Sequence, residues 1–286
     1  MTPRCGQSAG LRVRGEFLDL GGARLYYYAA GTRGVGVPVV FLHGFPTSSH
    51  LWADVVPLMP PGHRLVVVDL LGFGRSDRPL SHRVDIEAHA ERTLALLDEL
   101  RIDRACLVGH GIGGGIAQAV ALRQPRRISH LCLIDSVMLG QHLTIGGPLA
   151  RTALSVAKWL PSKLLLAVLR RELGRCYSDP SRAERSIDLY LRPFGDDAGR
   201  AALAAHVRAL AKDGTNDHES RISSLGMPTS LVWGDHDRLN PVSVGRRLQS
   251  AIPGATLNVI AGARHFTPEE SPRKIAESIA ALLDRA

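Results

Sequence analysis

The stretch Ala105–Arg123 reads ACLVGHGIGGGIAQAVALR. Its apolar start, Ala105–Val108, predicts a short buried strand, and the run Ile112–Arg123 predicts a helix. The letters GHGIGG at residues 109–114, where the strand passes into the helix, predict a tight turn, because glycine tolerates backbone angles that other residues avoid. A strand that passes directly into a helix is the unit from which helix-covered parallel sheets are built. We therefore expect an α/β fold.

The same alternation extends in both directions along the chain. Strands are predicted at Glu16–Asp19, Leu25–Ala29, Val37–Leu42, Arg64–Asp69, Ala105–Val108, His130–Ile134, Thr229–Trp233 and Thr256–Ile260. Helices are predicted at Leu51–Leu58, Val84–Leu100, Ile112–Arg123, Pro241–Ala251 and Pro272–Leu283. Strands separated by helices favour parallel pairing. The expected core is a mostly parallel, eight-stranded sheet with helices on both faces.

The segment from Val137 to Pro228 interrupts this pattern. Its strand signal disappears, and helical periods follow one another between prolines. We interpret residues 137–228 as an inserted helical cap. The two flanking parts, residues 1–136 and 229–286, then form one α/β domain.

Composition bounds the class of protein. The chain has 286 residues, of which 45% are hydrophobic and 22% are charged, a balance typical of a soluble globular protein. The formal net charge is +8 at pH 7, but the arginines are scattered singly or in pairs. A nucleic-acid-binding surface gathers its basic residues on one element. The sequence therefore argues against a nucleic-acid partner.

Neither the N-terminus nor the cysteines indicate export, a membrane or a metal. Residues 1–14 lack the apolar stretch of a signal peptide, and no window is long and apolar enough to span a bilayer. The cysteines lack the spacing of a zinc site or a redox pair; they are Cys5, Cys106, Cys132 and Cys176. We expect a cytoplasmic protein without membrane association, metal or other cofactor. The sequence leaves its oligomeric state open.

Residues that carry chemistry follow the predicted strands, at the sheet edge where open α/β sheets bind ligands. They form the segments His43–Pro46, Asp69–Asp77, Gly109–Gly114, Gly234–Asp237 and Gly262–Phe266. In order and spacing these segments resemble the α/β-hydrolase superfamily. The resemblance is strongest to its capped branch of epoxide hydrolases, haloalkane dehalogenases, cofactor-free haloperoxidases and carbon–carbon bond hydrolases. It covers nearly the whole chain outside the cap. One such motif is weak evidence, but five in register are specific.

The resemblance implies a catalytic site with one departure. The family places a nucleophilic side chain in the middle of its G-x-S-x-G turn, and that position is Gly111 in this chain. Asp237 matches the family's acid and His265 its base. The backbone N–H groups of Phe45 and Ile112 match its oxyanion hole. The family's machinery is thus expected around a position that has no nucleophile.

Alternatives remain open for two of these positions. Gly111 is also the residue that takes a strained turn at least cost, so a site released from catalytic selection would relax to it. In place of Asp237, either Asp235 or Asp135 would serve as the acid that orients His265.

Other residues are expected to line a pocket. His43 and His110 flank the backbone turns of the family's site, and Ser136 follows a predicted strand. The cap supplies Trp159 and Tyr177. The family's epoxide hydrolases use cap tyrosines to polarise an epoxide, but that role has little support here without the nucleophilic Asp.

Two functions fit these residues. In the first, His265 oriented by Asp237 deprotonates a water or a substrate C–H or O–H, and the oxyanion hole holds the developing charge. The substrate is then a small apolar carbonyl compound, and the reaction is hydrolysis or that of a lyase, cyclase or isomerase. In the second, the chain is a catalytically inactive member that binds a small molecule or a partner. Acyl-enzyme catalysis is excluded unless another residue reaches the site, because losing a triad serine costs on the order of 10⁶ in kcat.

Overall fold

An eight-stranded sheet forms the centre of the computed structural model, which describes residues 15–32, 34, 36–138, 161–212 and 221–285. Its strands are β1 (Gly15–Asp19), β2 (Arg24–Gly31), β3 (Val39–Leu42), β4 (Arg64–Val68), β5 (Ala105–His110), β6 (Ile128–Ile134), β7 (Thr229–Gly234) and β8 (Thr256–Ile260). They are ordered β1-β2-β4-β3-β5-β6-β7-β8. The β1–β2 and β2–β4 pairs are antiparallel, and the others are parallel. The predicted mostly parallel sheet of eight strands is confirmed.

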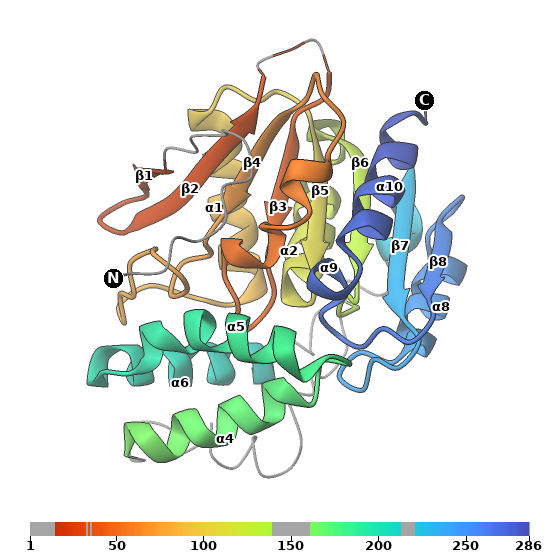
Figure 1. The fold of residues 1–286 in the computed structure, drawn as a ribbon. Coiled ribbons are helices and arrows are strands. Elements are labelled where there is room, and N and C mark those ends of the chain that lie inside the picture. Colours follow the sequence, from red (N-terminus) through yellow and green to blue (C-terminus); the bar gives the residue numbers. More distant parts are fainter. Residues whose placement is uncertain (1–14, 33, 35, 139–160, 213–220, 286) are drawn as a thin grey trace, which may run out of the picture.

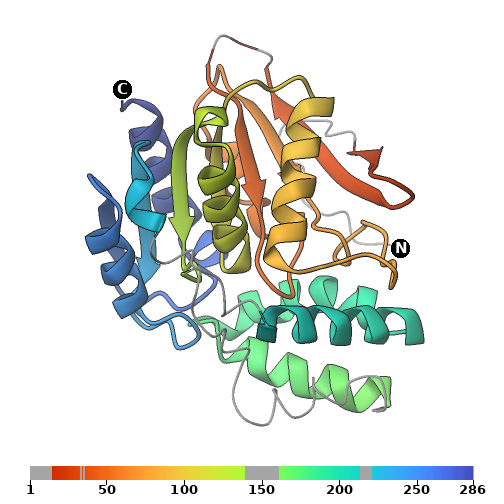
Figure 2. The ribbon, with the colours of Figure 1, turned by 180° about the vertical axis from the view of Figure 1, so that it is seen from behind.

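Helices cover both faces of this sheet (Figures 1 and 2). One face carries α1 (Ile86–Glu99), α2 (Ile112–Arg123) and α8 (Val242–Ala251), and the other carries α10 (Pro272–Leu283) with the short turns η1 (Ser49–Trp52) and η2 (Val56–Leu58). Every residue of β3, β5, β6 and β7 is buried. Such continuous apolar runs are typical of parallel strands covered on both faces.

Two predicted helices differ from the observed ones for local reasons. The expected helix Leu51–Leu58 is replaced by η1 and η2, with Pro57 in the second turn. Proline lacks the N–H that a continuous helix needs at that position. Helix α1 begins at Ile86 because the Asp85 side chain accepts a hydrogen bond from the N–H of Ala88 (2.8 Å) and caps its first turn.

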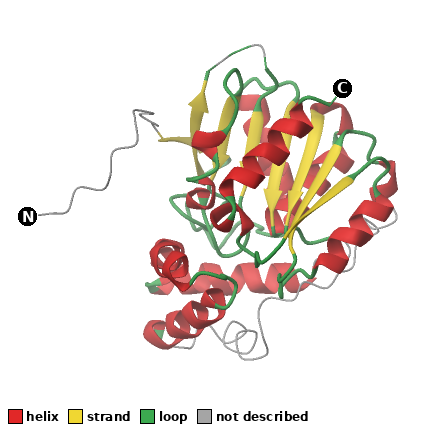
Figure 3. Ribbon diagram, turned by 45° about the vertical axis from the view of Figure 1, so that its right-hand side comes forward, coloured by secondary structure: helices red, strands yellow, loops and turns green. Residues whose placement is uncertain are grey.

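The chain between β6 and β7 contributes only helical elements among its described residues. These elements are α4 (Ser162–Gly174), α5 (Pro180–Leu191), η5 (Arg192–Phe194), α6 (Asp197–Lys212) and η7 (Ile222–Ser224). Helices α4, α5 and α6 lie beyond the carboxyl ends of the parallel strands (Figure 3). Residues 139–160, including Trp159, lie outside the described part of the chain.

The β5–α2 turn brings backbone against backbone. A β-carbon on Gly109 would lie 2.3 Å from the Gly113 carbonyl oxygen, and one on Gly113 would lie 2.3 Å from the Leu42 carbonyl oxygen. Both distances are far below a van der Waals contact, so neither position has room for a side chain. The turn therefore packs closely against the end of β3 only because glycine occupies both positions.

We expect Gly113→Ala to lower the free energy of unfolding by about 3 kcal/mol, because backbone atoms must move to admit the methyl group. The matched control is Gly174→Ala at the end of α4, where an added β-carbon meets no atom within 4 Å. That variant should change stability by less than about 1 kcal/mol. Chemical denaturation measures both. Equal stability of the two variants would contradict the packing argument.

Candidate active site

His265 and Asp237 meet at the carboxyl ends of neighbouring strands. Asp237 follows β7 and His265 follows β8, and both are buried. The Nδ1–H of His265 donates a hydrogen bond to Asp237 Oδ2 (2.8 Å). The other oxygen, Oδ1, accepts bonds from the backbone N–H groups of Leu239 (2.8 Å) and Asn240 (3.0 Å). The carboxylate is thus held on both oxygens, and it orients the imidazole.

The other two candidate acids have different partners. Asp235 Oδ1 accepts a hydrogen bond from the N–H of Gly262 (2.8 Å). Asp135 is fully buried; its Oδ1 accepts from the N–H of Gly234 (2.9 Å), and its Oδ2 accepts from the Thr267 hydroxyl (2.6 Å). Among the described residues, Asp237 alone of the three acids bonds to the His265 ring.

Buried charges surround this pair. Burial of His265 disfavours its imidazolium, but the charge and hydrogen bond of Asp237, with Asp135 and Glu270 further away, raise the pKa of His265 above its usual value. Burial, reinforced by the nearby Asp237 charge, raises the pKa of Asp135 well above its usual range. Asp237 is thus the carboxylate that contacts the imidazole, at Nδ1, whereas burial favours the neutral form of Asp135.

Gly111 lies opposite the other imidazole nitrogen. It caps the start of α2 with φ +55° and ψ −121°, a conformation that side chains rarely adopt. A β-carbon built on Gly111 would lie 3.7 Å from His265 Nε2 and 3.4 Å from Gly44 Cα, both ordinary contacts. The Nε2 atom has no hydrogen-bond partner among the described residues. The geometry thus directs the free imidazole nitrogen at the Gly111 turn.

Two backbone N–H groups border the same turn. Ile112 is the first residue of α2, so its N–H has no partner within the helix. Phe45 follows Gly44, which is in contact range of Gly111, and the Phe45 N–H makes no hydrogen bond within the described ranges. Donors in such positions are able to stabilise a developing oxyanion.

The two predicted pocket histidines support neighbouring backbone. The N–H of Leu70 donates to His43 Nε2 (2.9 Å), so Nδ1 carries the proton and donates to the Gly44 carbonyl (2.8 Å). His110 donates from Nε2 to the His265 carbonyl (2.9 Å), and its ring centroid lies 4.7 Å from that of His265. Burial and the nearby His265 lower the pKa of His110 well below its usual value. Both rings fix the loops around Gly111.

Ser136 and Tyr177 are also tied to other groups. The Ser136 hydroxyl donates to the Val137 carbonyl (2.7 Å) and accepts from Gln118 Nε2 (3.1 Å). Tyr177 stacks on Phe266 with 4.4 Å between ring centroids. A pocket role for these residues stays a prediction.

Glu269 is a buried residue that the sequence analysis did not single out. Its side chain is 7% exposed and accepts hydrogen bonds from the hydroxyls of Tyr177 (3.1 Å), Ser186 (2.5 Å) and Tyr190. Burial raises the pKa of this carboxyl group. Glu269 follows His265 closely in the chain and thereby ties the loop that carries the imidazole to α5. The only signal for it in the sequence is the acidic pair that closes His265–Glu270.

The described ranges contain neither a candidate metal site nor a candidate membrane-spanning helix. No set of three or more His, Cys, Asp and Glu side chains there is arranged to hold a metal ion. In the same ranges, no helix has the length and apolar character needed to cross a membrane.

Comparison with known proteins identifies a matching family model, relatives similar in sequence and solved structures with a similar fold. A family model described as alpha/beta hydrolase fold matches residues 37–272. The chain is 30% identical over 272 residues to the 2-hydroxymuconate semialdehyde hydrolase of Pseudomonas sp. (strain CF600), covering 90% of this chain and 93% of the relative. It is 30% identical over 287 residues to haloalkane dehalogenase 2 of Mycobacterium tuberculosis (strain CDC 1551 / Oshkosh), covering 92% and 93%. An alpha/beta hydrolase fold protein from Burkholderia ambifaria superposes with a TM-score of 0.80 at 28% identity, covering 94% of this chain and 97% of that one.

We expect Asp237→Asn to lower the pKa of His265, because the variant removes the adjacent charge and leaves the effect of burial. A folded-state pKa above the unfolded one stabilises the protein at low pH, and this contribution is lost as pH rises through the folded pKa. The variant should therefore lose stability relative to the parent mainly below about pH 6.5.

NMR titration of the His265 imidazole measures this shift, and denaturation at several pH values measures the stability. Asp235→Asn is the matched control, because Asp235 bonds to Gly262 rather than to the imidazole. A His265 pKa that responds equally to both substitutions would contradict the assignment of Asp237 as its partner.

Proposed function

Because the chain belongs to the α/β-hydrolase fold family, we propose that it is an enzyme that acts on a small apolar carbonyl-type substrate without a covalent enzyme intermediate. The observation that carries this proposal is the direction of His265 Nε2, which faces the turn at Gly111 while Nδ1 is bonded to Asp237. An imidazole held in one tautomer with a free nitrogen at the site is equipped to act as a general base.

The proposed reaction uses water as the nucleophile. His265 Nε2 takes a proton from a water as its oxygen adds to the substrate carbonyl carbon. The carbonyl oxygen becomes an oxyanion, which the N–H groups of Phe45 and Ile112 stabilise. When the tetrahedral intermediate collapses, the bond to the leaving group breaks, and the leaving group takes the proton from His265. Asp237 stabilises the imidazolium between these two steps.

The rate accelerations expected from the general base and the oxyanion donors are together large enough for an enzyme. A positioned general base contributes about 10² to 10⁴ in rate, and one oxyanion-hole donor contributes about 10² to 10³. Proton abstraction from a substrate C–H or O–H would use the same base and the same donors. The class thus includes lyase, cyclase and isomerase reactions beside hydrolysis.

The relatives support a carbonyl substrate. The Pseudomonas relative is named as a hydrolase of 2-hydroxymuconate semialdehyde, a compound whose name specifies an aldehyde carbonyl. Coverage of that relative is 93%, so the comparison includes the region that surrounds the site.

Gly111 also favours a second candidate function, that of a catalytically inactive member that binds a small molecule or a partner. Glycine takes the φ of +55° at this turn without strain, and a binding protein has no need of a nucleophile. The two functions differ in whether the His265 imidazole is required, which the following experiments determine.

We expect purified protein to turn over at least one member of a panel of small esters, lactones, epoxides and 1,3-diketones. His265→Ala should lower kcat by about 10² to 10⁴, the contribution of a general base. His236→Ala, at an exposed ring beside Asp235, should leave turnover unchanged. Turnover that survives in His265→Ala would exclude the imidazole from the mechanism, and a panel without turnover would favour the binding function.

We further expect Gly111→Ser to create an esterase, because a hydroxyl one bond beyond the added β-carbon falls within hydrogen-bond reach of His265 Nε2. The variant should hydrolyse short p-nitrophenyl esters with a burst and react with a fluorophosphonate probe, whereas the parent does neither. Gly111→Ala is the matched control: it carries the same backbone strain, about 1 to 3 kcal/mol, without the hydroxyl. A folded Gly111→Ser variant that behaves like Gly111→Ala would contradict the proposed geometry.

A further inference from the structure

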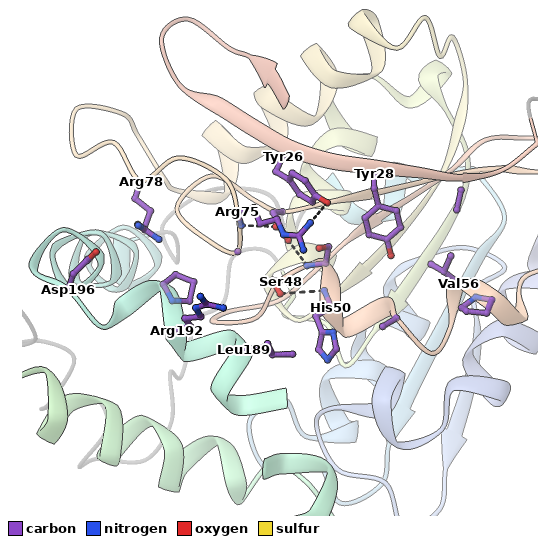
Figure 4. A pocket seen from close by; sticks show the side chains of 17 residues that line it. Tyr26, Tyr28, Ser48, His50, Val56, Arg75, Arg78, Leu189, Arg192 and Asp196 are labelled. Carbon is purple, nitrogen blue, oxygen red and sulfur yellow. Dashed lines mark hydrogen bonds between the residues drawn. The ribbon is translucent and has the colours of Figure 1, made fainter. Parts of the chain in front are cut away.

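A large cavity lies apart from the His265 site. It has a volume of about 860 Å³ and opens between β2, the loops that follow β3 and β4, and the α5–η5 segment (Figure 4). None of Phe45, Gly111, Ile112, Asp237 and His265 lines it. Ligand pockets typically measure about 300 to 1,000 Å³, so this cavity is large enough for a small organic molecule.

Three arginines line the cavity: Arg75, Arg78 and Arg192. Arg75 is held in place, since its Nη1 donates to the Tyr26 hydroxyl oxygen (2.6 Å) and its guanidinium lies 4.9 Å from the centre of that ring. Arg78 is half-buried and Arg192 is exposed. None of the three forms a salt bridge with a described residue. Their guanidinium groups are therefore able to bind an anion.

Two carboxylates also line the cavity, Asp69 and Asp196, but they accept hydrogen bonds from backbone N–H groups and not from the arginine side chains. Asp69 is 1% exposed, and its oxygens accept hydrogen bonds from the backbone N–H groups of Ser49 (2.6 Å) and Arg75 (2.8 Å). Asp196 Oδ1 accepts from the N–H of Gly199 (2.6 Å). Backbone amides thus satisfy both acids, and the guanidinium groups stay available for a ligand.

From one end of the cavity to the other, the lining changes from polar to apolar. Figure 4 shows Arg78 and Arg192 toward one end of the cavity, Val56 toward the other, and Tyr28 with its hydroxyl directed between them. The Tyr28 hydroxyl has no hydrogen-bond partner among the described residues. Burial raises the pKa of Tyr28, so its hydroxyl stays protonated and able to donate. Leu189 adds apolar surface below the same opening.

We propose that this cavity binds a small amphipathic organic anion, with a carboxylate or phosphate head between Arg75, Arg78 and Arg192 and an apolar chain that extends toward Val56. Guanidinium groups bind both kinds of oxyanion with paired hydrogen bonds. The three arginines outnumber the two carboxylates of the lining, so the cavity carries a net positive charge that attracts an anion. Burial of the chain against Val56 and Leu189 adds the hydrophobic contribution.

The experiment compares octanoate, octyl phosphate and octanol, which share one chain and differ in the head group. Isothermal titration calorimetry on the full chain should detect binding of octanoate or octyl phosphate, and octanol should bind at least about tenfold more weakly. Whichever of the two anions binds more tightly shows whether the cavity prefers a carboxylate or a phosphate head group. Shortening the chain from octanoate to hexanoate should weaken binding by up to about fourfold per methylene.

The variant Arg78→Gln/Arg192→Gln should weaken binding of the anion by about tenfold or more, because it removes two charge-assisted contacts. The matched control is Arg273→Gln/Lys274→Gln, which removes the same charge from exposed positions on α10 and should bind as the parent does. His265→Ala should also bind normally, because His265 does not line the cavity.

Three results would overturn the proposal. They are the absence of binding by either anion, equal affinity for octanol, and affinity that falls in His265→Ala while persisting in Arg78→Gln/Arg192→Gln. The last result would place the anion at the candidate active site. Circular dichroism on each variant shows whether it is folded, and the single substitutions replace the double one if it is not.

Discussion

The close approach of backbone to backbone at the β5–α2 turn is the constraint on which the site depends. Gly113 lies against the carbonyl of Leu42 at the end of β3, and this contact brings the loop after β3 to the start of α2. The same packing places Gly44 and Phe45 beside Gly111. Helix α2 then begins directly after Gly111, so its first N–H groups belong to this turn. The positions of the Phe45 and Ile112 N–H groups, and the position opposite His265, therefore depend on one turn that only glycine can form.

The carboxyl groups buried near this turn are tolerated because each of their described oxygens accepts a hydrogen bond. Asp237 is held by two backbone N–H groups as well as by His265, and Asp135 by an N–H group and a hydroxyl. Burying an ionised group without such partners would cost several kcal/mol. The preorganised donors offset that cost, and they leave His265 Nε2 as a polar atom at the site without a described partner. A free ring nitrogen held in a fixed orientation is what a general base requires.

The fold was largely predictable from the sequence, since hydrophobic periodicity and glycine positions determine strands and helices locally. The observed bounds of α2 and of β8, Thr256–Ile260, agree with the predicted ones. The family resemblance favoured Asp237, but the residues alone left Asp135 and Asp235 open, because the choice depends on which carboxylate the fold directs at the imidazole. The cavity beside β2 was not predictable either, because its lining comes from segments between Tyr26 and Asp196 that are brought together only by the fold. The roles of the site residues stay predictions.

The hydrogen bonds of Glu269 limit which sequences could replace the helical segment between β6 and β7, which contains α4, α5 and α6. Hydroxyls of Tyr177, Ser186 and Tyr190 from that segment hold a carboxylate on α9 (Thr267–Glu270), the short helix that follows His265. A transplanted segment without these hydroxyls would leave the carboxylate buried and unsolvated, at a cost of several kcal/mol. The segment is thus not an independent module. Its diversification is restricted to replacements that preserve the three donors or change Glu269 at the same time.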